Sequence, residues 1–453
     1  MVMRARFQMR RLLASTVLAS SLAAASFAAP AADLLQIYRL AQGADAVYAA
    51  ARATWSAIQE KLPQGRAGLL PSATLSASTQ YNDREIEFRS PANPSTAGQF
   101  NSNTWSLSLT QPLYRRQNLV AYEQAQTQVG QADTQLALAG QDLILLVSQA
   151  YFDVLLALNN AELAAAQKVA ISEQLAQAKR NFEVGTATIT DTHEAQARYD
   201  LAVAQEIAAQ NDLEIKRRQL AQIIGRPAPA LSLLAGQIML ELPQPNQIQP
   251  WVEEATRASL AVLVSEAALT FSRQEIERNR GGHHPTLDAF ATYTDAGSGS
   301  GIQGGPGTDT TTRVIGLQLA VPLYQGGATA SRIREALANE DKARQELENA
   351  RRSAELAAHQ AFLGVTNGVS QVNALRAALV SSQSSLDSTR LGLQVGVRTQ
   401  VDVLNAQQQL FSTRRDLAQA AYNYVLSFLR LKAAVGRLSE DDVAKVNAWL
   451  GRK

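Results

Sequence analysis

Two copies of one structural unit fill most of the chain, and this duplication constrains the fold more than any other feature. Three landmarks recur at nearly one offset, the first 210 residues later and the others 211 residues later: 107–114 (LSLTQPLY) with 317–324 (LQLAVPLY), 184–185 with 395–396 (both VG), and 225–226 with 436–437 (both GR). Chance does not keep one offset across three landmarks. Both structural repeats are therefore expected to fold in the same way.

Proline shows where each repeat is helical, because it breaks the interior of a helix. No proline occurs between Pro112 and Pro227, and none follows Pro322. The intervening stretches are rich in alanine, leucine, glutamine, glutamate and arginine, which favour helix. Residues 115–183 and 325–393 can each form one helix of 69 residues, which is roughly 100 Å long at about 1.5 Å per residue.

A turn is expected to end each long helix at the Val-Gly landmark. Gly185 and Gly396 suit the left-handed conformation that closes a helix C-terminus. The patterns T-x-x-D at 188–191 and 399–402 match the capping box that starts a new helix. The sequence therefore predicts two antiparallel helical hairpins, over 115–225 and 325–436.

The return helix of the second hairpin shows its packing face directly. Large residues recur every seven positions, and small residues follow with the same period three positions behind: Val403, Leu410, Leu417, Tyr424 and Leu431, with Ala406, Thr413, Ala420, Ser427 and Ala434. This pattern is typical of a coiled-coil seam, in which the small residues allow a close approach of the helices.

Segments with a period of two precede each hairpin, at about 73–82 and 104–113 in the first repeat and about 286–294 and 312–323 in the second. Strands of about ten residues with one apolar face are typical of transmembrane barrels; a small soluble sheet is the alternative. The connections 83–100 and 295–311 are predicted to be long loops on the outer face.

Four strands cannot close a membrane barrel, since the smallest barrels use about eight. Open sheet edges facing lipid are not tolerated, so the chain must share its barrel with copies of itself. The predicted fold class is mainly α with β and has an internal duplication. Long antiparallel coiled-coil hairpins follow the strand pairs, and each chain contributes four strands to a shared transmembrane β-barrel.

The remaining segments have distinct compositions. Residues 1–28 combine four arginines, an apolar run and small residues, as a secretory signal peptide does. Without those four arginines, Lys+Arg falls from 42 to 38 against 40 Asp+Glu, so nucleic-acid binding is not expected. The first structural repeat then spans 29–225 and the second 258–436. The proline-rich stretch 226–257 is predicted to be an irregular equatorial linker, and 437–453 a C-terminal equatorial segment.

At this point the sequence resembles the TolC family of outer-membrane efflux proteins. The most specific motifs are 182–191 (FEVGTATITD) and 395–404 (VGVRTQVDVL), and the similarity runs from 33–38 (DLLQIY) to 438–442 (LSEDD). The resemblance implies a homotrimer in outer-membrane lipid with an α-helical barrel in the periplasm. It also implies a periplasmic adaptor and an ABC or proton-driven inner-membrane transporter as partners. The missing anchor cysteine favours the branch serving type I secretion and multidrug efflux.

The resemblance further implies that the helix-turn tips meet at the periplasmic end and constrict the pore. By motif position this gate contains Thr190, Asp191, Arg398, Asp402 and Asn405. Arg398 is expected to pair with a tip acid such as Asp191 in the closed state, and adaptor docking is expected to replace that contact. A ring of Asp402 would attract cations. The alternative is that both aspartates only cap their helices.

Catalysis is not expected, because no nucleophile elbow, metalloprotease helix or P-loop is present. No cofactor is expected either. A metal site is not expected, because the chain has no cysteine and its four histidines (His193, His283, His284 and His359) are scattered. Hydrolysis of ATP must then occur on a partner. The main rival interpretation is a periplasmic adaptor or coiled-coil scaffold, but two hairpins, each preceded by a strand pair, argue against it.

Overall fold

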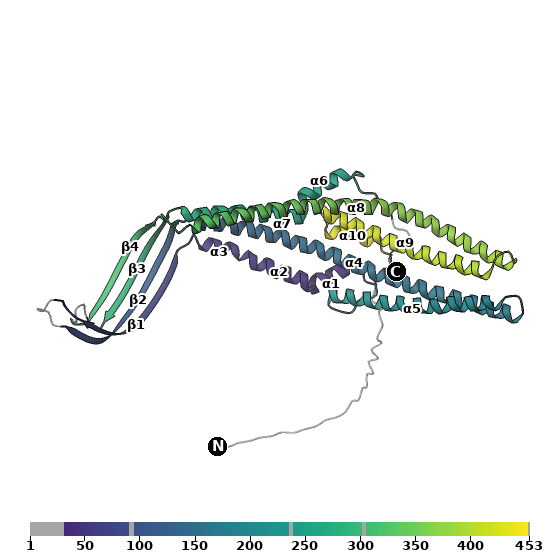
Figure 1. Cartoon of the computed structure of the whole chain (residues 1–453), viewed down its shortest axis with the longest axis horizontal. Coiled ribbons are helices and arrows are strands. Elements are labelled where there is room, and N and C mark those ends of the chain that lie inside the picture. The colour runs from purple at the N-terminus through teal and green to yellow at the C-terminus, as the bar shows by residue number, and fades with distance from the viewer. Residues whose placement is uncertain (1–30, 90–94, 235–238, 301–304, 452–453) are drawn as a thin grey trace, which may run out of the picture.

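The computed structural model describes residues 31–89, 95–234, 239–300 and 305–451. The molecule is elongated, with a sheet at one end and the tips of two helical hairpins at the other (Figure 1). The predicted signal peptide, 1–28, lies outside the described residues, as do the central residues of both connections between paired strands.

Four antiparallel strands form the sheet, in the order β1-β2-β3-β4. Their bounds are β1 Ser72–Ile86, β2 Thr96–Tyr114, β3 Thr286–Ser298 and β4 Thr308–Ala320. Each repeat contributes one strand pair, and the two pairs join through β2 and β3. Strands β1 and β4 are therefore edges, each with one side free of any partner within this sheet.

The two faces of the sheet have opposite chemistry, as the alternation predicted. One row across the strands consists of Ala73, Leu109, Ala291 and Ile315, and a row on the opposite face consists of Ser76, Ser106, Thr294 and Thr312. Ile315 of β4 is 87% exposed, which shows that no described helix covers the apolar face at this strand. Such a face requires an apolar environment outside the chain.

The connections between paired strands are shorter than the sequence predicted. The predicted loops 83–100 and 295–311 are largely strand, because pairing continues to Ile86 with Thr96 and to Ser298 with Thr308. Backbone hydrogen bonds propagate a ladder whatever the polarity of the side chains, so polar composition was a poor guide to the strand ends. The strands of 15 and 19 residues in the first repeat exceed the roughly ten residues needed to cross a bilayer.

Both predicted hairpins are present. The long helices are α4 Arg116–Glu183 and α8 Ala328–Gln394, with 68 and 67 residues, and the return helices are α5 Ile189–Ile224 and α9 Gln400–Ala434. In the seam of the second hairpin, Val403, Leu410, Tyr424 and Leu431 are buried. Glycine allows the closest approach of its helices: a Cβ added at Gly364 would lie 2.7 Å from Ser427 Oγ.

Four further helices lie between mid-height and the sheet (Figure 1), and the sequence analysis did not predict them. They are α1 Leu34–Ala44, α2 Ala46–Gln59 and α3 Lys61–Ala67 before β1, and α7 Leu260–Arg280 before β3. The short 3₁₀ turn η1 Gly281–His283 leads from α7 into β3. Helices α2 and α3 pack on α4, and α7 packs on both α4 and α8. Each repeat therefore begins with helices, not with strands.

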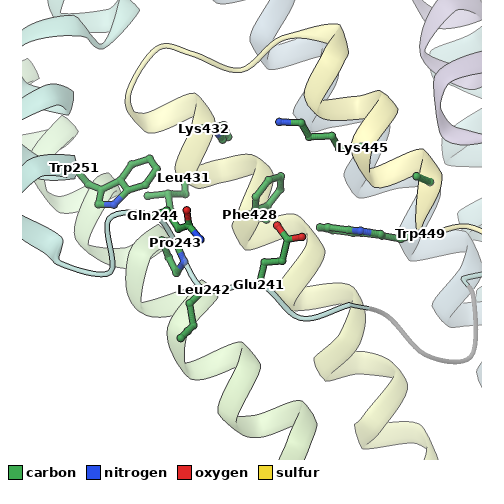
Figure 2. Close-up of a pocket in the computed structure, with 11 residues that line it drawn as sticks. Glu241, Leu242, Pro243, Gln244, Trp251, Phe428, Leu431, Lys432, Lys445 and Trp449 are labelled. Carbon is green, nitrogen blue, oxygen red and sulfur yellow. The ribbon is translucent and has the colours of Figure 1, made fainter.

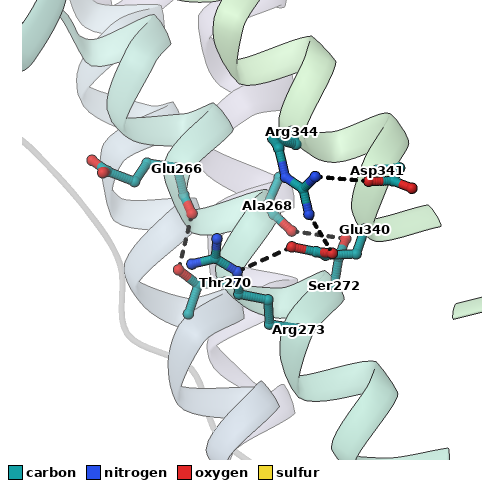
Figure 3. Close-up of polar contacts among 8 residues, drawn as sticks. All are labelled: Glu266, Ala268, Thr270, Ser272, Arg273, Glu340, Asp341 and Arg344. Atoms are coloured by element: carbon teal, nitrogen blue, oxygen red, sulfur yellow. Dashed lines mark hydrogen bonds and ion pairs between the residues drawn. The ribbon is translucent and has the colours of Figure 1, made fainter. Parts of the chain in front are cut away.

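An ion-pair network joins α7 to α8 (Figure 3). The carboxylate of Glu340 accepts hydrogen bonds from Arg344 (2.8 Å) and from Arg273 of α7 (3.3 Å). Both hydrogen bonds lower the pKa of Glu340, and the bond from Arg344 has the larger effect. Arg344 also pairs with Asp341 at 2.9 Å. Since a network is more favourable than isolated surface pairs, it fixes α7 against the long helix.

A belt at mid-height brings the N-terminal, linker and C-terminal segments together. The phenol of Tyr151, in α4, is fully buried and donates to the carbonyl oxygen of Ser232 at 2.7 Å. The N–H of Ser232 donates to Ala32 O (3.0 Å), and that of Gly451 donates to Leu233 O (2.8 Å). Two short helices also form in these segments: α6 Ile248–Ala258 at the end of the predicted linker, and α10 Glu440–Ala448 in the C-terminal segment.

Within the described residues, one helix, α4, contains a window that is apolar and long enough to cross a membrane by length and composition alone. More than half of that window is buried inside the protein, and Tyr151 and Phe152 lie in the main hydrophobic core. The apolar character of α4 is therefore explained by packing in the belt.

Candidate gate at the helix tips

The two hairpin turns have the same geometry. Gly185 and Gly396 follow the long helices with φ of 77° and 80°, the left-handed conformation that the sequence predicted. Just beyond each glycine the chain folds back onto its helix: Thr186 N–H donates to Asn181 O (2.8 Å), and Val397 N–H donates to Gly392 O (2.9 Å). The duplication therefore extends to the hydrogen bonds of the turns.

Capping boxes start both return helices, as predicted. In the first, Thr188 N–H donates to Asp191 Oδ2 (2.9 Å), and Asp191 N–H donates to Thr188 Oγ1 (3.2 Å). Thr399 and Asp402 repeat these bonds with the same two lengths. Both aspartates are thus held in fixed orientations at the tips, where the adjacent Thr190 is exposed.

The carboxylate of Asp402 is held in its charged form. The backbone N–H of Thr399, then its hydroxyl, and finally the positive charge of Arg398 lower its pKa below the usual value of 3.8. A group with a lowered folded-state pKa contributes stability above its unfolded pKa and loses that contribution as the pH falls through the folded pKa. Asp402 therefore remains negative throughout the neutral and mildly acidic range.

Arg398 and Asp191 lie on different hairpins and do not pair within one chain. Among the described residues Arg398 forms no ion pair with any acid, and its side chain is exposed. The predicted closed-state pair is absent from the described part of this single chain and stays a prediction. Capping and gating are compatible. The carboxylate of Asp402 accepts both of its bonds from Thr399 through Oδ2, so its Oδ1 takes no part in the cap.

Arg198 joins the two hairpins near their tips, and the sequence analysis missed it. Its guanidinium, on α5, donates to Gln408 Oε1 at 2.8 Å and to Asn405 Oδ1 at 3.2 Å, both on α9. Nearby, Gln400 Nε2 of α9 donates to Gln174 Oε1 of α4. We name these five residues the hairpin clasp. Of the predicted gate residues, the clasp contains only Asn405.

The apolar contact beside the hairpin clasp is small. It consists of Ile171, Ala202 and Leu404, with Tyr199 packed against them. Gln407 is only 2% exposed, and its Oε1 has no hydrogen-bond partner among the described residues. An unpaired buried amide costs free energy. The hairpins are therefore joined weakly here, in contrast to the large core of the belt.

The histidines do not converge. Within the described ranges, no group of three or more His, Cys, Asp or Glu side chains could hold a metal ion. His284 Nδ1 lies 3.2 Å from the hydroxyl of Tyr114, where the helical region joins the sheet.

Sheet, hairpins and tips together define a class of protein: a membrane duct anchored by strands and extended by long helices. The sequence model of the outer membrane efflux protein family matches residues 37–226 and 251–437, one match per repeat. Outer membrane protein TolC of Escherichia coli is 34% identical over 443 residues, covering 95% of this chain and 88% of that protein. Proteases secretion protein PrtF of Dickeya chrysanthemi is 32% identical over 425 residues, covering 93% and 92%.

Solved structures agree with this match at the level of the fold. The crystal structure of outer membrane protein VceC from Vibrio cholerae aligns with a TM-score of 0.76 at 18% identity, covering 89% of this chain and 96% of that one. The chain belongs to the outer membrane efflux protein family and is located in the outer membrane, extending into the periplasm.

Proposed function

We propose that three copies of this chain form one continuous exit duct, with a barrel of twelve strands in the outer membrane and a helical barrel in the periplasm. The observation that carries this proposal is the sheet, whose edges β1 and β4 are open and whose apolar face is uncovered. A bilayer offers no partner for unpaired backbone groups. Pairing β4 of one copy with β1 of the next satisfies both edges.

The duct is proposed to serve a tripartite efflux or type I secretion system. Both contexts are represented among the comparisons: the matching family model describes outer membrane efflux proteins, and one relative with high coverage is named proteases secretion protein PrtF. A periplasmic adaptor and an inner-membrane transporter would be its partners, and the transporter would supply the energy. The chain itself then contributes a wall and a gate, without chemistry on the substrate.

Trimer formation is tested with the protein extracted from outer membranes in mild detergent. We expect a protein mass three times that of one chain, by light scattering corrected for detergent. In planar bilayers the same sample should give discrete ion-conducting events. A monomeric mass, or recovery of the protein in the soluble periplasmic fraction, would contradict the proposal.

The tips are proposed to form the periplasmic gate. In the proposed trimer, Arg398 of one copy would pair with Asp191 of a neighbour, and three copies of Asp402 would surround the entrance. In the single chain Thr399 and Arg398 lower the pKa of Asp402, so each copy would bring a charged carboxylate to the entrance near neutral pH. Cations are attracted to such a ring and anions are disfavoured.

Asp402→Asn should remove block of the pore by a multivalent cation while preserving the helix cap, because the asparagine amide oxygen can still accept the bond from Thr399 N–H. In the parent protein the block should be constant from about pH 8 to 5 and disappear only below the usual carboxylate pKa of about 4. Conductance in planar bilayers measures both effects. Asp200→Asn, an exposed acid further along α5, is the matched control. Unchanged block in Asp402→Asn would restrict Asp402 to capping.

A further inference from the structure

A cavity of about 580 Å³ opens on the belt, far from both the sheet and the tips (Figure 2). Three structural segments line it: the linker strap at residues 241–244, the last turns of α9, and helix α10, with Trp251 of α6 closing one side. This volume is typical of sites that bind a small molecule or a short polymer segment. The proposed duct gives this cavity no role.

Aromatic rings form its walls and are held in place. Trp449 packs against Phe428, with ring centroids 5.6 Å apart, and against Tyr424, at 6.1 Å. The phenol of Tyr424 accepts from Glu241 N–H (2.8 Å) and donates to Glu241 O (3.0 Å). This pair of bonds fixes the strap over α9. The indole N–H of Trp251 donates to Pro245 O at 2.9 Å. Because these contacts hold the rings in place, the pocket is preformed.

Charge is distributed unevenly around the cavity. Lys432 and Lys445 lie along one side, and the carboxylate of Glu241 lies across from them (Figure 2). Neither lysine forms an ion pair with any described residue. Each is in the last turn of its helix, where a cation is favoured by the helix dipole. The helix dipole explains why each lysine lies at the end of its own helix. It does not explain why two helices direct unpaired cations to the same aromatic pocket.

The position of the pocket along the length of the molecule limits which ligands can reach it. Phe428 is 28 residues from the start of α9, which places the pocket roughly 40 Å from the tips at about 1.5 Å per residue. The contact of Ser427 with Gly364, 36 residues into α8, places it roughly 55 Å from the sheet end. That height is out of reach of the outer-membrane lipid and lies within the periplasm.

We propose that this pocket binds peptidoglycan, the carboxylate-bearing glycan that fills the periplasm. Aromatic rings offer flat apolar surface to the faces of the sugars, as Trp449 and Phe428 would here. The two lysines would pair with carboxylates of the peptide stem, and Glu241 with its free amine. A duct anchored in this way would be held at a fixed place in the cell wall. The inference rests on the periplasmic placement of the helices and not on the gate.

Co-sedimentation tests the site with purified full-length protein, in the oligomeric state in which it is extracted, and isolated peptidoglycan sacculi. The parent protein should sediment with sacculi at physiological salt. The double variant Lys432→Ala/Lys445→Ala should lose at least tenfold in apparent affinity, and Lys432→Arg/Lys445→Arg should restore most of it. Lys179→Ala, an exposed lysine of α4 without an ion pair, is the matched control. Bilayer conductance of all variants should equal that of the parent, which separates this result from a failure of the duct.

Competition identifies the ligand. Soluble disaccharide-peptide fragments released from sacculi should displace the protein, and they should quench its tryptophan fluorescence. Replacement of Trp449 with phenylalanine should reduce that quenching. Equal binding of the double alanine variant would overturn the proposal. Equal competition by the stem peptide without its sugars would also overturn it, in favour of an acidic peptide as the occupant.

Discussion

Arg198→Ala should raise the resting conductance of the duct by roughly two orders of magnitude. Its bonds to Gln408 and Asn405 join the two hairpins of one chain near the tips. A hydrogen bond to a charged group contributes about 1.5–3 kcal/mol. Because 30% of the Arg198 side chain is exposed, we discount this to roughly 1 kcal/mol, or about fivefold in the opening equilibrium. Three chains opening together multiply the effect to about a hundredfold.

Planar bilayers provide the measurement, with the fraction of time spent in the high-conductance state as the readout. Arg218→Ala serves as the control, since Arg218 is on the same helix α5, pairs only with Glu214 as an ion pair, and is 77% exposed. It should leave the opening equilibrium unchanged. An Arg198→Ala protein with parental conductance and an intact trimer would show that the hairpin clasp does not hold the closed state.

Gly436→Ala should destabilise the assembled protein by about 2–5 kcal/mol. Gly436 follows α9 with φ of 72°, a conformation that costs a residue with Cβ about 1–2 kcal/mol. The added Cβ would also collide with the carbonyl oxygen of Ala258, and overpacking of this kind costs about 1–3 kcal/mol. The temperature at which the purified oligomer unfolds, and its amount in outer membranes, should both fall.

Two other glycines separate the cost of the backbone conformation from the cost of the collision. Gly225, the equivalent residue of the first repeat, has φ of 68° but a wider space, with the nearest atom Ala44 Cβ at 3.2 Å; its alanine variant should cost mainly the backbone strain. Gly140 is inside α4, and its added Cβ would meet only Tyr48, at 4.0 Å, so alanine there should be neutral or slightly stabilising. Equal losses at all three sites would show that the collision with Ala258 is absent.

Much of the fold could be predicted because each repeat carries local signals at fixed positions. Proline-free stretches identified α4 and α8, and the Gly-x-x-Thr-x-x-Asp spacing identified both turns, including the left-handed Gly185 and Gly396. The alternation around Leu107 and Leu317 identified the strands. These signals depend on neighbours in the sequence, so no knowledge of the tertiary structure was needed.

The parts that sequence reasoning missed depend on contacts between distant residues. Helices α1 to α3 pack on α4 from outside the proline-free region. Their local sequence signals are short: the capping box of Asp33 with Gln36 and the N-cap Asp45 of α2. The strand ends were set by backbone pairing and not by polarity. Arg198 and Gln408 are 210 residues apart, and nothing local to either one shows that two hairpins meet there.

The row of hydroxyls formed by Ser76, Ser106, Thr294 and Thr312 has a consequence for solutes leaving the cell. In the proposed closed ring of strands this row would line the interior, and at its level it presents short neutral groups that favour neither sign of charge. Two charged residues of the same face, Arg84 and Asp288, lie toward its two ends. A molecule that has passed the charged helix tips would then meet hydroxyl groups that bind it weakly, whether it is acidic, basic or uncharged. Selection by charge would then act at the ends of the passage, and the stretch of wall formed by this row would add none.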